Sequence, residues 1–160
     1  MIRLIAAIDR QRGLARHGIL PWHIPEDEQY FTDKTKSLGG NVLTGATTYK
    51  ITYHGPLADR QNFILTHDET PIEGVTLVHD LDEFLRGFTE DLWVAGGAKV
   101  FEQVIKLGKA DELYLTHIDA DFGCDQLFPE YEEQFKLVEQ SQPHEQNGFH
   151  FRYARYAKTN

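Results

Sequence analysis

Cysteine is almost absent from this sequence of 160 residues, which contains only Cys124. An intrachain disulfide is therefore impossible, and a zinc site built from cysteines lacks its ligands. The eight histidines do not have the spacing of a zinc-binding helix, so we expect no metal site. No apolar run of about 18 residues occurs, and the apolar residues 1–9 are too few for a signal peptide. We therefore expect a cytoplasmic protein that has no membrane partner.

Basic residues are also scarce, because 16 Lys and Arg face 25 Asp and Glu for a net charge of −9. This balance disfavours binding to a phosphate backbone, so we expect no nucleic-acid partner. The hydrophobic fraction of 41% and the aromatic fraction of 12% can fill one core. No linker or repeat divides the chain, which predicts one domain over residues 1–160, and nothing indicates more than a monomer.

Apolar patterning predicts strands that alternate with helices. The strands are expected at residues 2–8, 41–45, 61–66, 75–78, 91–95 and 112–119, and the helices at residues 25–38, 46–52, 80–88 and 97–107. Residues 135–140 and 149–157 read as strands, with a turn signal at 146–148, so we expect a C-terminal hairpin at one edge of the sheet. This alternation is typical of an α/β domain with right-handed crossovers.

The segment around Pro25 places a carboxylate on an apolar helix face. Pro25 suits the first turn of a helix, and Ile24, Asp27, Phe31 and Leu38 then fall on one face. A buried carboxylate without a cationic neighbour either takes up a proton or meets a partner rich in donors, and that partner can be a ligand. The alternative is that Asp27 is a half-exposed partner of the helix dipole.

A glycine pair separates a predicted strand from a predicted helix. Gly96 and Gly97 bring free backbone N–H groups and the positive end of the helix dipole to one point, which suits a pyrophosphate. The segment is not the Rossmann fingerprint, because Ala98 and Phe101 occupy the places of the later glycines. The alternative is an ordinary tight turn.

These two segments resemble signatures of the dihydrofolate reductase family. The first is the Pro-Trp of Pro21-Trp22 followed by Pro25, Asp27 and Phe31, and the second is Gly-Gly-Ala-Lys-Val-Phe at residues 96–101. Further matches follow in the family's order up to about residue 129. The resemblance implies an α/β fold with a mostly parallel, eight-stranded twisted sheet, flanking helices and an antiparallel C-terminal hairpin.

The resemblance also implies an activity, the NADPH-dependent reduction of 7,8-dihydrofolate to tetrahydrofolate. Hydride would pass from nicotinamide C4 to pterin C6, and water would protonate N5. Diaminopyrimidine or pteridine antifolates would be inhibitors. Two alternatives stay open, namely a pterin or pyrimidine reductase of the same fold and a catalytically silent pterin-binding module.

The family's functional residues can be transferred onto matching positions. Those near the reaction would be Asp27, Trp22, Leu20 and Thr116. Those binding the substrate would be Ile5, Ala7, Asp27, Glu28, Phe31, Leu57, Arg60 and Thr116. Those binding the cofactor would be Ala7, Leu14, Leu20, Gly45, Ala46, Thr47, Thr48, Leu65, Thr66, His67, Ala95, Gly96, Gly97, Ala98, Lys99, Val100, Phe101 and Asp125. In the family, Asp125 would hold the loop that covers the site.

Several positions depart from the family's pattern. Ala46 stands where an Arg is expected, Glu28 replaces an apolar residue, and Ala15 replaces a glycine before the covering loop. Cys124 precedes Asp125. These departures concern cofactor affinity, inhibitor affinity and loop switching.

Overall fold

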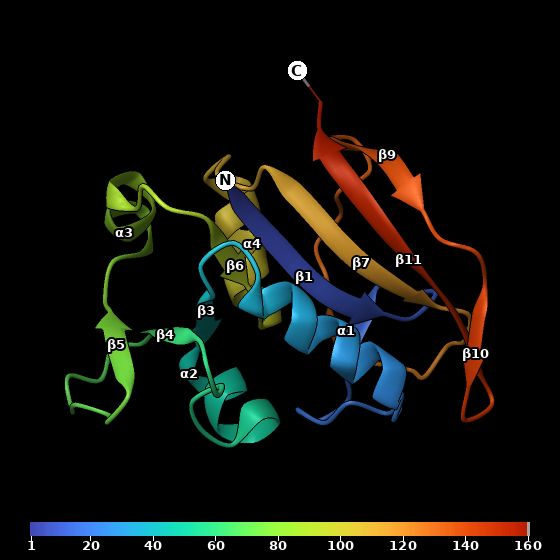
Figure 1. Cartoon of the computed structure of the whole chain (residues 1–160), viewed down its shortest axis with the longest axis horizontal. Coiled ribbons are helices and arrows are strands. Elements are labelled where there is room, and N and C mark those ends of the chain that lie inside the picture. Colours follow the sequence, from blue (N-terminus) through green and yellow to red (C-terminus); the bar gives the residue numbers. More distant parts are fainter. Residues whose placement is uncertain (160) are drawn as a thin grey trace.

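The computed structural model describes residues 1–159 and shows a twisted sheet with helices on both faces (Figure 1). Its strands follow the order β10-β11-β7-β1-β6-β3-β4-β5, and β9 also pairs with β11. The strands are β1 (Ile2–Ile8), β3 (Asn41–Gly45), β4 (Gln61–Leu65), β5 (Val75–Val78), β6 (Leu92–Val94), β7 (Glu112–Ile118), β9 (Phe135–Gln140), β10 (His144–Gln146) and β11 (Phe149–Lys158).

The sheet is parallel from β7 to β5 and antiparallel at its C-terminal edge. Strand β1 pairs in parallel with both β6 and β7, whereas β11 runs antiparallel to β7. Strands β9 and β10 both pair with β11, along different parts of its length, so they share one edge position. The prediction of a mostly parallel sheet with eight strand positions and an antiparallel hairpin is confirmed.

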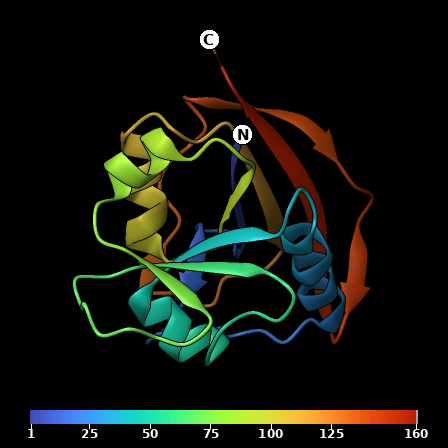
Figure 2. The same ribbon diagram turned by 60° about the vertical axis from the view of Figure 1, so that its left-hand side comes forward.

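Side-chain alternation along β1 divides the core between the two faces of the sheet. Leu4 packs with the apolar side chains of α3 (Leu81–Gly87) and α4 (Ala98–Lys106), whereas Ile5 packs towards α1 (Pro25–Lys36). Figure 2 shows α1 on the side of the sheet that carries β11, away from α3 and α4. Both faces of the sheet are covered at β1, which explains its continuous apolar sequence.

Three of the four predicted helices are present as α1, α3 and α4, with one error at the end of α1. Asp80 Oδ1 accepts a hydrogen bond of 3.0 Å from the backbone N–H of Glu83, which caps α3 as predicted. Helix α1 ends at Lys36, so the prediction that Leu38 shares its apolar face is wrong. Leu38 has a φ of 57° and is 49% exposed, because the chain has already turned out of the helix. None of the helices within residues 1–159 has the length and apolar character needed to cross a membrane.

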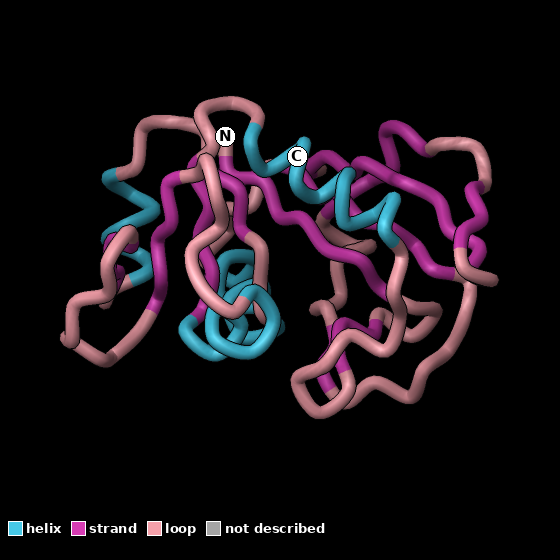
Figure 3. Tube along the Cα trace, turned by 60° about the horizontal axis from the view of Figure 1, so that its bottom comes forward, coloured by secondary structure: helices cyan, strands magenta, loops and turns pink. Residues whose placement is uncertain are grey.

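The segment predicted as a helix at 46–52 forms two short turns, and a small second sheet was not predicted. The turns are α2 (Ala46–Thr48) and the π-helical η1 (Tyr49–Tyr53). Strands β2 (Gly13–Ala15) and β8 (Gln126–Leu127) form the second sheet. They are too short to give a periodic sequence signal. Figure 3 shows that this pair, α2 and the loops around them gather at one end of the main sheet.

Asp9 connects the loops at this end. Its buried carboxylate accepts hydrogen bonds from the backbone N–H groups of Gly13, Gln11 and Phe122, at 2.7, 2.9 and 3.1 Å. Burial alone would raise the pKa of Asp9, but these donors outweigh it and hold the pKa below its usual value. The chain after β1 is thereby fixed to the segment before β8.

Candidate active site

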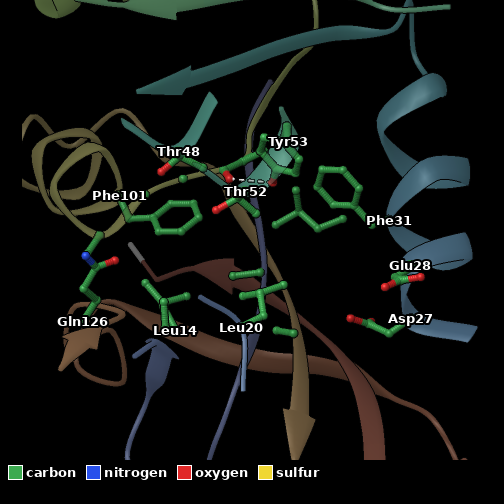
Figure 4. A pocket seen from close by; sticks show the side chains of 18 of the residues that line it. Leu14, Leu20, Asp27, Glu28, Phe31, Thr48, Thr52, Tyr53, Phe101 and Gln126 are labelled. Atoms are coloured by element: carbon green, nitrogen blue, oxygen red, sulfur yellow. Dashed lines mark hydrogen bonds between the residues drawn. The ribbon is translucent and has the colours of Figure 1, made fainter. Parts of the chain in front are cut away.

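A cleft of about 340 Å³ opens at the carboxyl ends of β1 and β6. Ligands of open α/β sheets bind in this location, where the chain leaves the central strands in opposite directions. In Figure 4, Asp27, Glu28 and Phe31 lie at one end and Thr48, Phe101 and Gln126 at the other, with Leu14 and Leu20 between them. Predicted site residues that line the cleft are Ile5, Ala7, Leu14, Leu20, Trp22, Asp27, Glu28, Phe31, Thr48, Leu57, Arg60, Ala95, Gly96, Gly97, Ala98 and Phe101.

Asp27 projects from the first turn of α1 into the cleft and is half-buried. The hydroxyl of Thr116, from β7, donates a hydrogen bond of 2.7 Å to Asp27 Oδ1. Burial raises the pKa of Asp27 to about 6, opposed by the Thr116 hydrogen bond and reinforced by the charges of Glu28 and Glu26. This carboxyl group can therefore exist in either protonation state near neutral pH, as expected of a group that handles protons.

Small and apolar residues surround this carboxyl group. Ile5 and Ala7 of β1 line the cleft, while Thr116 lies behind Asp27 and is 2% exposed. Trp22 is buried, and its ring lies 5.3 Å from that of Phe122. The walls at this end offer apolar surface for a flat ring and one carboxyl group to orient it.

Arg60 lies at the outer end of the same half of the cleft. Its guanidinium donates to the hydroxyl of Thr35 at 2.8 Å and to the carbonyl of Ala58 at 3.0 Å. Burial lowers the pKa of Arg60, yet a guanidinium stays protonated at any ordinary pH. Leu57 and Phe31 provide apolar surface between this charge and Asp27. The arrangement suits a ligand with a flat head, an apolar middle and a terminal carboxylate.

The other half of the cleft fits a phosphorylated cofactor. A Cβ added to Gly97 would lie 2.6 Å from Thr48 Oγ1, so the glycine keeps backbone and hydroxyl close together there. The Gly96–Gly97 peptide is cis. No side chain caps α4 and its first turn contains no acidic residue, so its N–H groups and dipole remain available to an anion. These features fit the pyrophosphate of NADPH.

Other predicted site residues do not line the cleft. They are Gly45, Ala46, Thr47, Leu65, Thr66, His67, Lys99, Val100, Thr116 and Asp125. Thr66 and His67 follow the end of β4, where the backbone carbonyl of Thr66 bonds to His79 Nδ1 at 2.8 Å. Asp125 contacts the segment that contains Leu14 and Leu20, because its two carboxylate oxygens each lie 3.1 Å from the backbone nitrogen of His17.

Several lining residues were missed by sequence reasoning, among them Thr32, Thr52, Tyr53 and Gln126. Tyr53 donates its hydroxyl proton to the carbonyl of Ala95 at 3.0 Å, and its ring stacks on Phe31 at 5.5 Å. Thr32 lies four residues after Glu28 on α1, so helical spacing could have found it. No sequence signal identifies Gln126, because the strand β8 that carries it has only two residues.

Fold and cleft together define a class of protein, an α/β oxidoreductase that binds a dinucleotide and a flat heterocycle at the carboxyl ends of parallel strands. A family model described as dihydrofolate reductase matches residues 1–158. The dihydrofolate reductase of Bacillus subtilis (strain 168) is 33% identical over 166 residues, covering 100% of this chain and 96% of that protein. The chain belongs to the dihydrofolate reductase family, of the bacterial type, and is an NADPH-dependent oxidoreductase.

Two further comparisons agree with this assignment. The type 3 dihydrofolate reductase of Salmonella typhimurium is 34% identical over 134 residues, covering 82% of this chain and 80% of that protein. A solved structure of the dihydrofolate reductase from Enterococcus faecalis, complexed with NADP(H) and RAB-propyl, superposes with a TM-score of 0.86. It is 28% identical and covers 100% of this chain and 97% of that chain. The eight-position sheet is therefore shared with a solved member of the family.

Proposed function

We propose that this protein reduces 7,8-dihydrofolate to tetrahydrofolate with NADPH. The observation that carries the proposal is Asp27, a half-buried carboxyl group whose pKa is raised to about 6 and which Thr116 orients in the cleft. The pterin ring of dihydrofolate carries an amide and an amino group side by side. A carboxylate can accept hydrogen bonds from both, which fixes the ring and replaces the water that the carboxylate has lost.

In this mechanism the protein orients the substrate and controls water. NADPH, when bound in the half of the cleft near Gly97, supplies the hydride that reduces pterin C6. Asp27 holds the opposite edge of the ring and polarises it, and a water molecule delivers the proton to N5. Leu14 and Leu20 line the cleft between the two halves and limit the access of further water. The guanidinium of Arg60 binds the α-carboxylate of the substrate tail.

The oxidation of NADPH in the presence of dihydrofolate tests this proposal. Turnover with dihydrofolate that exceeds turnover with other pterins and with pyrimidines supports it. Preference for another pterin or a pyrimidine would instead indicate a reductase of the same fold with a different substrate. Binding of dihydrofolate without NADPH oxidation would indicate a silent pterin-binding protein.

Cofactor choice provides a prediction about the residues beyond the cleft. We expect NADPH to be preferred to NADH although Ala46 replaces an Arg, a loss that costs on the order of 1.5–3 kcal/mol of binding free energy. Thr66, His67 and Lys99 remain as donors for the 2′-phosphate. Lys99 carries a compact ammonium charge and not a planar guanidinium that donates two parallel hydrogen bonds. The preference for NADPH over NADH should therefore weaken as salt is added. The measurement is kcat/KM for both cofactors at two salt concentrations.

A Thr66→Ala/His67→Ala double variant identifies the phosphate-binding groups in that prediction. The preference should decrease in the double variant, and a His79→Gln variant reports whether the imidazole that contacts the Thr66 carbonyl participates. A wild-type ratio near one, or a ratio unchanged by the double variant, would show that the end of β4 does not bind the phosphate.

Glu28 provides a prediction about inhibitors. Its exposed carboxylate lies at the outer edge of the cleft, with Oε1 at 3.2 Å from His23 Nδ1. An apolar group of an inhibitor bound next to Glu28 would have to displace water from its carboxylate, which weakens binding. We expect Glu28→Leu to tighten the binding of a diaminopyrimidine antifolate by about fivefold, through restored apolar contact. The measurement is the inhibitor Kd, with Glu28→Gln as the control that removes the charge alone, and an unchanged or weaker Kd in the Leu variant contradicts the prediction.

A further inference from the structure

The first turn of α1 is fastened to the C-terminal hairpin through Glu26. The backbone N–H of Glu26 donates a hydrogen bond of 2.7 Å to Gln146 Oε1, in β10. Glu26 Oε2 accepts the hydroxyl proton of Tyr153 at 3.0 Å and lies 3.0 Å from His144 Nδ1. Residues 118 to 127 positions away in sequence thus hold the residue that directly precedes Asp27.

Tyr153 links this contact to the other side of Asp27. Its ring stacks on that of Tyr30, one helical turn from Glu26, with 4.0 Å between centroids and 23° between planes. In the sheet, Tyr153 of β11 is the register partner of Thr116, whose hydroxyl bonds to Asp27. One residue of β11 therefore touches the helix that carries the carboxyl group and neighbours the strand that orients it. Figure 1 and Figure 2 show α1 lying beside this edge of the sheet.

We propose that Glu26, held by His144 and Tyr153 of the C-terminal hairpin, is a positioning residue that fixes the first turn of α1 and thereby places the Asp27 carboxyl group in the cleft. The inference rests on the proposed function for its consequence in catalysis. Its structural part, the placement of a carboxyl group by a distant hairpin, stands on the contacts alone. Glu26 does not line the cleft, so it acts on the site only through Asp27.

The charge of Glu26 also bears on Asp27. The charges of Glu26 and Glu28, on the same helix, both favour the protonated form of Asp27. The groups from other elements that face Asp27 are the hydroxyl of Thr116, which donates to it, and the hydroxyls of Tyr153 and Tyr53, which burial keeps protonated. Glu26 is thus one of two anionic neighbours, and the one whose position the hairpin determines.

Three variants separate position from charge. Glu26→Ala removes both, and we expect the KM for dihydrofolate to rise by about tenfold through misplacement of Asp27. Glu26→Gln keeps an acceptor for the Tyr153 hydroxyl, so KM should return close to the wild-type value. Tyr153→Phe keeps the stacking on Tyr30 but removes the hydroxyl donor, so it should give an intermediate KM.

NMR titration of the Asp27 carboxyl carbon supplies a readout that does not depend on turnover. In Glu26→Gln the midpoint of this titration should fall by about 0.5 pH unit, because an anionic neighbour is lost. Asp33→Asn, an exposed change on the same helix, should leave the midpoint unchanged. Wild-type midpoints and wild-type KM values in both Glu26 variants would overturn the proposal. Absence of dihydrofolate turnover in the wild type would overturn the proposed function instead. A midpoint that differs between Glu26→Ala and Glu26→Gln, which both lack the charge, would still report the placement of Asp27.

Discussion

Asp27→Asn is expected to lower kcat with dihydrofolate by about 10²- to 10³-fold at neutral pH, the range associated with loss of a group that stabilises charge in the transition state. Asparagine has nearly the same volume as aspartate, so the cleft keeps its shape. The amide cannot ionise, and it presents only one acceptor oxygen to the pterin amide and amino groups. The measurement is steady-state NADPH oxidation across pH.

The same substitution should raise the free energy of unfolding near neutral pH although it lowers activity. Folding raises the pKa of Asp27 from 3.8 to about 6. The contribution of Asp27 to the free energy of unfolding is therefore most favourable below pH 3.8 and is lost as pH rises through 6. Above that pH the protein holds a buried ionised carboxylate, at a cost of at most about 3 kcal/mol. The Asn variant avoids this cost. Its free energy of unfolding relative to wild type should therefore increase by about 1 kcal/mol between pH 5 and pH 8.

Asp33→Asn is the matched control for both measurements. Asp33 lies on the exposed side of α1, where its carboxylate accepts a hydrogen bond of 2.8 Å from Gln29 Nε2. It should leave both kcat and the pH dependence of unfolding close to wild type. An Asp27→Asn variant with activity within threefold of wild type would disprove the assignment of Asp27.

Arg60→Leu is expected to raise the KM for dihydrofolate by about 10- to 100-fold while kcat changes little. A hydrogen-bonded pair between a guanidinium and a carboxylate contributes about 1.5–3 kcal/mol, and the pair binds the substrate tail rather than the reacting ring. Thr35 and Ala58 already fix the guanidinium, so little further ordering is needed when the tail binds.

A substrate that lacks the tail carboxylate tests the location of this effect. Its KM should be nearly the same in wild type and Arg60→Leu. Arg60→Lys keeps the charge without the planar fork and should recover only part of the loss. If the variant raised KM equally for substrates with and without the carboxylate, Arg60 would be supporting the shape of the cleft instead.

The sequence predicted the centre of the fold better than its periphery. The apolar run at residues 2–8 predicted a strand between parallel neighbours, and the structure confirms it. Helical spacing placed Asp27 on the inward face of α1, because its local neighbours Ile24 and Phe31 determine that face. The position of Leu38 was wrong because periodicity does not show where a helix stops, and the chain turns at Ser37.

Contacts between distant segments could not be predicted in this way. The sequence shows no reason why Glu26 should meet Tyr153, since 127 positions separate them and both are ordinary surface residue types. The pairing of β2 with β8 is likewise absent from any local pattern. These contacts depend on the packing of the whole sheet. The orientation of the cleft residues on β1 and α1 could be predicted because it depends on apolar residues close to them in the sequence.

The position of β1 has a consequence for synthesis on the ribosome. Both neighbours of β1 come from later parts of the chain, since β6 comprises Leu92–Val94 and β7 comprises Glu112–Ile118. A nascent chain therefore exposes this apolar strand without a pairing partner until more than half of the protein has been translated. Chaperones that bind extended apolar segments would meet this strand first, and the cleft could assemble only after β7 had left the exit tunnel.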